Sequence, residues 1–336
     1  MGGRIVVGVD GSVSATAAVE WAAADARRRG LALRIVHVCE QWAVTVSGTA
    51  SGSAAGSAVE STAESTAEST VASTAGTAGG APGAVAYCAR ALDAAAGHAR
   101  DLAPGVEVTT GMLTGGVIEA LVRESASADG VVVGSRGLGG FAGMLLGSVG
   151  LNLAGHAAGP VVVVRGPSVV QHDQIVVGYD GSEHSTAAMA YAIEQARSRD
   201  AQLYVVTAWP MPVFSPYAAA YSDLLQQVYE EEVRRARAWV VPWRERNPDV
   251  RIVDDQVSEH PVSALVKASA SADLVVVGSR GHGGFAAAVL GSVSHGVLHH
   301  VTCPVAVVRP RDDRREPPAG GGTPPTGGHE ETRERS

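Results

Sequence analysis

Two nearly identical glycine-rich segments have the residue types and spacing to bind phosphate. One covers residues 134–148 and reads GSRGLGGFAGMLLGS, and the other covers residues 278–292 and reads GSRGHGGFAAAVLGS. Each follows a run of valines and precedes a stretch with helical character. Glycines let the main chain approach an anion closely, and the free N–H groups at a helix N-terminus favour negative charge. The pattern therefore indicates a loop that holds phosphate oxygens.

These segments differ from the common phosphate loops. A P-loop carries a lysine beside its last glycine, and the dinucleotide fingerprint follows the first strand of its domain. Here Leu146 precedes Gly147, and Lys267 is the only lysine of the chain. Arg136 and Arg280 are the local candidates to compensate phosphate charge, with main-chain dipoles and a divalent metal as further candidates. A solvated loop arginine is the alternative reading of both.

An aspartate follows the first apolar run of each half of the chain. Asp10 stands in IVVGVDGS and Asp180 in IVVGYDGS. A contact to a nucleotide or metal is favoured for both, with a turn-forming aspartate as the alternative. Ser12 and His37 do not complete a catalytic triad with Asp10, because nothing in the sequence places a base on a nucleophile.

No metal site is expected from the cysteines or histidines. Cys39, Cys88 and Cys303 are odd in number and widely separated, which favours reduced thiols over a disulfide frame or a zinc site. His295 and His299 are spaced to share a helical face, but no third ligand is evident, so surface histidines are expected.

Composition excludes several partners. The net charge is −8 and aromatic residues make up 4% of the chain, so neither a basic face nor stacking platforms for nucleic acid are available. No apolar run approaches the roughly 20 residues that cross a bilayer. The N-terminus lacks a secretory core. We therefore expect a cytoplasmic protein without membrane or nucleic-acid partners.

The chain is a tandem repeat. The segment from Ile5 matches the segment from Ile175 at an offset of 170, whereas SADGVVVGSRG from Ser127 matches SADLVVVGSRG from Ser271 at an offset of 144. The difference places 26 extra residues in the first copy. They fall in a Ser, Thr, Ala, Gly and Glu-rich insert, residues 45–80, which cannot bury enough apolar surface to order itself. The predicted domains are 1–166, which contains this insert, and 173–309, followed by a disordered tail at 310–336.

Periodicity alternates along each copy. Apolar β-branched runs predict strands at 5–9, 33–38, 106–110, 131–133 and 161–164, and helical stretches lie between them at 15–29, 84–102, 117–126 and 148–158. The apolar residues of the strands are continuous, which is typical of parallel sheets covered on both faces. The fold class is therefore α/β: two tandem doubly wound domains, each a five-stranded parallel sheet with helices on both faces. In such sheets ligands bind beyond the carboxyl ends of the strands, where the glycine segments begin.

These motifs and their order resemble the ATP-binding branch of the universal stress protein family. The resemblance covers residues 3–165 and 173–309 without the insert. It implies that the aspartate lies in the cleft, that the end of the second strand meets adenine, and that the glycine pattern binds the ATP phosphates and ribose. The implied cofactor-binding residues of the first half are Asp10, Val38, Gly134, Arg136, Gly137, Gly147, Ser148 and Val149. Those of the second half are Asp180, Ala208, Gly278, Arg280, Gly281, Gly291, Ser292, Val293 and Ser294.

One position departs from the pattern. The family often has a hydroxyl residue where this chain has Gly150, and the second half keeps Ser294. Weaker binding at the first site is one expected consequence, and altered access beside the insert is another.

The resemblance implies an ATP-dependent regulator of stress or growth arrest that docks on other proteins, with Mg²⁺ as an optional companion of ATP. Efficient catalysis is not expected, because the sequence shows neither a water activator nor a lysine clamp. A slow ATPase and a nucleotide-free interaction scaffold remain alternatives. The resemblance also implies that the halves pair through PVVVVRG and PVAVVRP, which closes unpaired sheet edges. Dimerisation of the whole chain stays open.

Overall fold

The computed structural model describes residues 3–39, 82–138, 146–166, 170–210, 222–282 and 289–311. The insert expected at 45–80 and most of the tail expected at 310–336 lie outside these residues. The first half contains, in order, β1 (Arg4–Gly8), α1 (Val13–Arg29), β2 (Ala32–Cys39), α3 (Pro82–Leu102), β3 (Val108–Thr114), α4 (Val117–Ser125), β4 (Gly130–Gly134), α5 (Ser148–His156) and β5 (Val161–Val164). The second half contains β6 (Gln174–Gly178), α6 (Glu183–Arg199), β7 (Gln202–Ala208), α7 (Ser222–Arg246), β8 (Ile252–Val257), α8 (Pro261–Ser269), β9 (Leu274–Gly278), α9 (Ser292–His300) and β10 (Val305–Val308).

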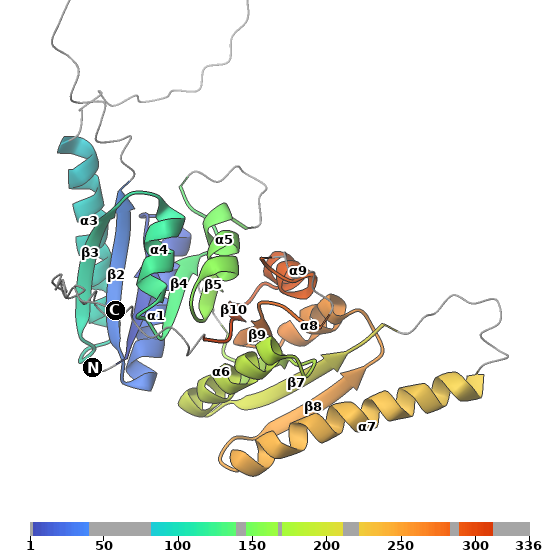
Figure 1. Ribbon diagram of the computed structural model, residues 1–336. Coiled ribbons are helices and arrows are strands. Elements are labelled where there is room, and N and C mark those ends of the chain that lie inside the picture. The colour runs from blue at the N-terminus through green and yellow to red at the C-terminus, as the bar shows by residue number, and fades with distance from the viewer. Residues whose placement is uncertain are drawn as a thin grey trace, which may run out of the picture.

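The described strands form one ten-stranded sheet in the order β3-β2-β1-β4-β5-β10-β9-β6-β7-β8 (Figure 1). Neighbouring strands within each half are parallel. At the seam β5 and β10 run antiparallel, with Ala306 opposite Val162. The predicted five-stranded parallel sheets and the predicted pairing through the last strands are therefore confirmed.

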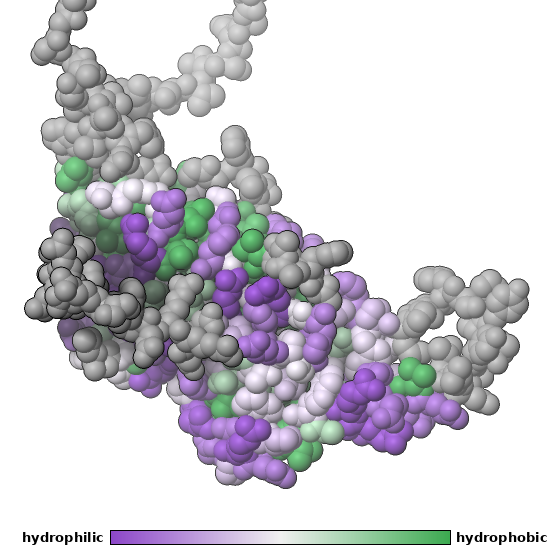
Figure 2. All heavy atoms as spheres, in the orientation of Figure 1, coloured by the Kyte–Doolittle hydropathy of each residue, from purple (hydrophilic) through white to green (hydrophobic). Residues whose placement is uncertain are grey.

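Helices cover both faces of the sheet. Residues of α1, α3, α6 and α7 form one apolar core with alternate strand residues such as Ile5 and Val7. Residues of α4, α5, α8 and α9 form a second core with the intervening residues, such as Val6. Burial on both faces explains why the strands read as continuous apolar runs. Hydrophilic side chains gather on the outer surface of α7 (Figure 2).

The third strand lies later in the chain than predicted. The apolar run favoured a strand at 106–110, whereas β3 spans Val108–Thr114. This strand lies at the outer edge of the sheet, with Thr109 and Thr110 exposed. Its length is set by main-chain pairing with β2, from Leu33 to Cys39, and not by an apolar run of its own.

The first turn after β1 and β6 is built by the repeated Asp-Gly-Ser sequence. Gly11 and Gly181 have φ values of 87° and 79°, a backbone region that side chains disfavour. Ser12 and Ser182 then cap α1 and α6, since each hydroxyl accepts a hydrogen bond from the N–H three residues later. The two aspartates are thus fixed at the carboxyl edge of the sheet.

Helices α1 and α6 also meet across the seam. Asp25 is 1% exposed, and its carboxylate accepts from Nε2 of Gln195 at 3.3 Å and pairs with Nη2 of Arg199 at 3.2 Å. Asp25 and Gln195 are equivalent positions at the repeat offset of 170. The halves are therefore arranged about a pseudo-two-fold axis. Among the described helices, none is long and apolar enough to span a membrane.

Candidate functional site

The aspartates and the glycine segments meet where the strand order reverses. The strand that leads to Asp10 lies beside the strand that leads to the first glycine segment, and the chain leaves these two neighbours in opposite directions across the sheet. The second half repeats this arrangement with β6 and β9. Such switch points are where ligands bind in open α/β sheets.

Asp10 connects the two segments. Its Oδ1 accepts from the N–H of Ser12 at 2.9 Å, and its Oδ2 accepts from the N–H of Leu138 at 3.0 Å. Leu138 belongs to the glycine segment, so one carboxylate joins the helix start to that loop. The aspartate is thus part of the loop's own structure as well as a candidate ligand.

Asp180 repeats the first of these bonds, because its Oδ1 accepts from the N–H of Ser182 at 3.0 Å. Burial alone would raise the pKa of Asp180, but hydrogen bonds from Ser182 and Ser185 outweigh it and hold the pKa below its usual value. The group is a carboxylate at neutral pH. It would repel phosphate oxygens, and it suits a hydroxyl donor or a divalent cation.

The glycines have different tasks. A Cβ at Gly137 would lie 2.7 Å from Oδ2 of Asp10, and one at Gly281 would lie 2.5 Å from Oδ2 of Asp180. These two positions therefore leave the carboxylate room beside the loop. A Cβ at Gly134 would instead meet the main chain of Ser14, with its carbon 2.7 Å away.

The equivalent Gly278 lies equally close to the first turn of α6, where a Cβ would come within 2.8 Å of the carbonyl carbon of His184. Gly134 and Gly278 were predicted to contact the cofactor. The structure gives both a packing task, because they let a helix start lie directly on the end of a strand.

The last glycine of each segment begins a helix. The N–H of Gly147 donates to the oxygen of Ser135 at 2.6 Å, and that of Gly291 donates to the oxygen of Ser279 at 2.8 Å. Both glycines occupy N-cap positions without a side-chain cap. The N–H groups available to an anion are consequently those that follow in the first turns of α5 and α9, which include Ser148, Val149, Ser292 and Val293.

We call the place where the aspartate, the glycine segment and the start of the following helix meet the corner of each half. Ser294 and Gly150 differ in the hydrogen bonds that they can form there. Ser294 is 1% exposed, and its hydroxyl donates to the oxygens of Ser279 at 3.1 Å and Gly291 at 3.0 Å. Its hydroxyl is therefore bonded to the main chain at the two ends of the glycine segment. Gly150 has no hydroxyl, so the first half lacks this pair of bonds.

The two loop arginines are not equivalent. Arg136 is exposed, whereas Arg280 is half-buried, and its Nε has no hydrogen-bond partner among the described residues. Burial, and to a smaller extent the positive charge of Arg280, lowers the pKa of Arg309. The Nε of Arg309 also has no hydrogen-bond partner in the described part of the chain. The charges of these two arginines therefore interact at the second corner.

The adenine edge expected from the resemblance lies along the same edge of the sheet. Val38 pairs with Leu113 at the end of β2, and Ala208 pairs with Val257 at the end of β7. Both strands are direct neighbours of those that lead to the aspartates. The predicted residues of each half are thus brought to one corner, apart from the side chain of Ser294 and the two packing glycines.

Aromatic residues of α3 and α7 contact the turns that follow β1 and β6. They were not assigned to the sites from the sequence. Tyr87 donates its hydroxyl proton to the main-chain oxygen of Asp10 at 3.0 Å. In the second half Trp239 packs on Gly181, where an added Cβ would lie 3.2 Å from its ring. No short motif marks them, because their helices follow segments with no match between the repeats.

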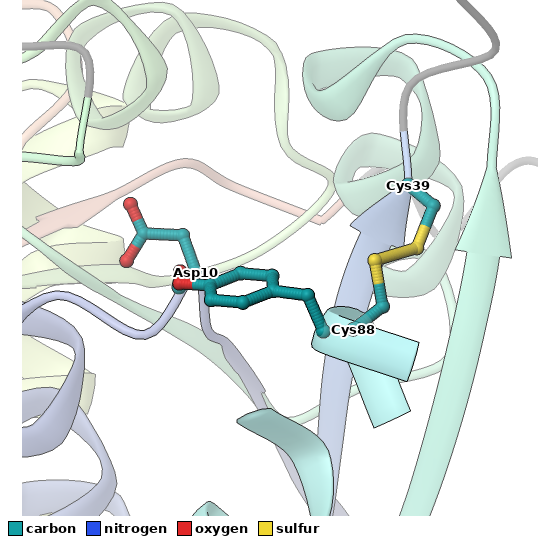
Figure 3. The surroundings of a disulfide bond; sticks show 4 residues. Asp10, Cys39 and Cys88 are labelled. Atoms are coloured by element: carbon teal, nitrogen blue, oxygen red, sulfur yellow. Dashed lines mark hydrogen bonds between the residues drawn. A yellow bond between two sulfur atoms is a disulfide. The ribbon is translucent and has the colours of Figure 1, made fainter. Parts of the chain in front are cut away.

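The prediction that all cysteines are free thiols is wrong. Cys39, at the end of β2, and Cys88, on α3, form a disulfide (Figure 3). Their positions 49 residues apart gave no sign that α3 returns to the strand end. Cys303 is free, and burial raises its pKa to about 12.

Comparison with known proteins agrees with this architecture. The model of the universal stress protein family matches residues 1–165 and 172–309. The chain belongs to the universal stress protein family. A universal stress protein of Mycolicibacterium smegmatis is 32% identical over 91% of this chain and 97% of its own length. One from Mycobacterium tuberculosis is 34% identical over 91% of this chain and 96% of its own length.

A solved universal stress protein from Archaeoglobus fulgidus has the same fold. It aligns with 93% of this chain and 97% of its own length, with a TM-score of 0.59 and 19% sequence identity. The sequence resemblance to this family is therefore confirmed.

Proposed function

We propose that each half of this universal stress protein binds one ATP at its corner, and that occupancy regulates docking on other proteins during stress or growth arrest. The observation that carries the proposal is a repeated geometry. In each half an aspartate, a glycine segment and a helix N-terminus without a side-chain cap meet at the switch point of the sheet. The regulatory role is proposed from the family resemblance.

The phosphates would lie at the first turns of α5 and α9. There the N–H groups of Ser148 and Ser292 and those after them offer donors, and the helix dipole adds positive potential. Arg280 adds a charge whose Nε has no partner in the described residues. A bound phosphate would offer this guanidinium an acceptor of opposite charge.

Asp10 and Asp180 would take a different part of the ligand. A carboxylate beside phosphates is stabilised by ribose hydroxyl donors or by Mg²⁺. Gly137 and Gly281 keep the space beside each carboxylate open, since a side chain would fill it. Mg²⁺, if bound with ATP, would supply charge neutralisation between the aspartate and the phosphates. Adenine would then meet the ends of β2 and β7 at Val38 and Ala208.

Binding without rapid turnover fits these residues. Lys267 lies elsewhere and pairs with Glu259. Ser12 caps α1, and its hydroxyl lies 3.2 Å from that of Ser14; none of its hydrogen-bond partners among the described residues is a histidine. A slow ATPase stays the alternative within the same site, and a nucleotide-free scaffold is the alternative without it.

Calorimetric titration with ATP, with and without Mg²⁺, tests the proposal. We expect two ATP molecules per chain in the wild type. Gly137→Leu and Gly281→Leu should each lose one of them, because the new side chain enters the space beside the aspartate. Gly97→Leu is the matched control, because a Cβ there meets nothing within 4 Å.

The outcomes separate the alternatives. No heat and no thermal shift with ATP would support the scaffold and overturn the proposal. Two sites retained in both loop variants would overturn the assignment of the site. Phosphate release that disappears in Asp10→Ala and Asp180→Ala would favour the ATPase.

A further inference from the structure

Three metal-ligating side chains meet beside the first corner. His37 and Cys39 lie two residues apart on β2 and therefore point to the same face of the sheet, and Cys88 approaches from α3. All three are buried, and their donor atoms lie within 4.8 Å of one another. Figure 3 shows the sulfur atoms between the strand end and the helix.

The disulfide joins the two cysteines of this cluster but leaves Nδ1 of His37 without a bonding partner in the described part of the chain. His37 is 7% exposed, and its Nδ1 has no hydrogen-bond partner among the described residues. Leaving such a nitrogen buried without a hydrogen bond is unfavourable. The ring contacts that of Tyr87 edge-on, with centroids 6.3 Å apart, and this contact does not use the nitrogen lone pair. A ligand bound to Nδ1 would satisfy it.

Two thiolates and an imidazole form a donor set for Zn²⁺. Zinc prefers sulfur and nitrogen ligands in tetrahedral geometry, and its four-coordinate sites separate neighbouring donors by about 3.5–3.8 Å. The three donor atoms already lie within 4.8 Å of one another. Once the disulfide is broken, a small separation of the two sulfurs would bring the donors to the distances of a tetrahedral zinc site. Two thiolates also balance the charge of the ion, which lets the site stay buried. With three protein ligands, one position remains for water or another ligand.

We propose that His37, Cys39 and Cys88 bind one Zn²⁺ when the disulfide is reduced. Two equivalents of a thiol reductant supply two electrons and two protons, which break the sulfur–sulfur bond and give two cysteine thiols and one oxidised disulfide of the reductant. Zn²⁺ binding then releases both thiol protons, as metal binding to thiols requires. Oxidation of the pair removes both sulfur ligands and releases the ion.

The cluster belongs to the first half alone. At the repeat offset of 170, Thr207 stands in place of His37 and Trp209 in place of Cys39. The second half therefore serves as an internal control. The proposal does not rest on nucleotide binding at either corner.

The test uses the full chain, stripped of metal and reduced with a phosphine under exclusion of air. Titration with Co²⁺ should give the intense visible bands of a tetrahedral thiolate complex at one ion per chain, and Zn²⁺ should displace it. Cys88→Ser and His37→Gln should each weaken binding at least about 100-fold. Cys303→Ser is the matched control and should bind as the wild type does.

His37→Gln separates the metal site from the disulfide, because this variant should still form the Cys39–Cys88 bond on oxidation. Circular dichroism of each variant establishes that it is folded. The proposal is overturned if the reduced wild type binds no Co²⁺, if the spectrum is the pale one of octahedral coordination, or if His37→Gln binds as tightly as the wild type.

Discussion

Arg309, which follows β10, donates a hydrogen bond to the main-chain oxygen of Gly155 in α5, in the other half of the chain. The equivalent Arg165, which follows β5, donates to the oxygen of Leu298 in α9. Each half thus contacts the last turn of the helix that follows the other half's glycine segment. The two halves therefore meet through these helices as well as through the β5–β10 seam.

Arg309→Ala should destabilise the protein by about 2 kcal/mol, because hydrogen bonds from a charged donor to Gly155 and Val289 are lost. Urea unfolding with a constant m-value measures the loss. Arg309→Lys keeps the charge but not the geometry of the planar guanidinium, and it should recover only part of the stability. Full stability in the alanine variant would show that the crossing contacts do not hold the seam.

Gly150→Ser should stabilise the first half by about 1 kcal/mol, since a helical glycine is replaced and a hydroxyl can repeat the bonds of Ser294. An added Cβ has room, because its nearest neighbour is Cγ2 of Val163 at 3.4 Å. Ser294→Gly is the reciprocal variant and should lose a similar amount. Thermal unfolding of both reports the signs. If both changes lower the melting temperature, the corners are not interchangeable.

Gly134→Ala and Gly278→Ala should each destabilise the protein by about 1–3 kcal/mol, because the new methyl group meets the first turn of the neighbouring helix. Gly97→Ala is the control in open space and should be neutral or mildly stabilising. Denaturant unfolding distinguishes the packing task from a ligand task, which would leave the free protein's stability unchanged.

His184 should make the protein less stable in mild acid. Burial, followed by the charges of Arg280 and Arg309, lowers the pKa of His184 below the ordinary 6.5. The acidic Glu183 and Asp180 oppose this shift without reversing it. As pH falls below the unfolded-state pKa, the unfolded chain takes up a proton that the folded chain refuses, so stability declines until the lower folded-state pKa is reached.

His184→Gln should remove that decline. Unfolding free energies measured from neutral to acidic pH should fall less steeply in this variant than in the wild type. His300→Gln, a change at an exposed histidine, provides the control. Parallel profiles for His184→Gln and the wild type would contradict the assignment.

The core strands could be predicted from the sequence because a short run of adjacent apolar residues is enough to indicate each of them. Val131 and Val161 belong to valine runs that are buried on both faces, and such runs leave little choice other than parallel strands. The edge strand β3 could not be placed as well, since Thr109 and Thr110 face solvent and pairing with β2 sets its extent. The pairing of β5 with β10 came from the family resemblance, not from the apolar pattern.

The corners could be predicted only in part. Asp10 and Gly137 follow strands whose carboxyl ends meet, so their proximity was implied by topology. The register of α3 was not implied, because the chain between residues 39 and 82 does not match the sequence between β7 and α7 in the second repeat. Tyr87 and Cys88 therefore remained unseen beside the strand end, and the cysteines were misread as free thiols.

The antiparallel pairing of β5 with β10 also has a consequence at low protein concentration. A lone five-stranded half would leave β5 or β10 as an open edge, available to any other copy it met. Fusing both halves in one chain makes that encounter intramolecular, so the partner is present at a fixed local concentration even when the protein is scarce. Each molecule thus has its two halves already paired along their last strands.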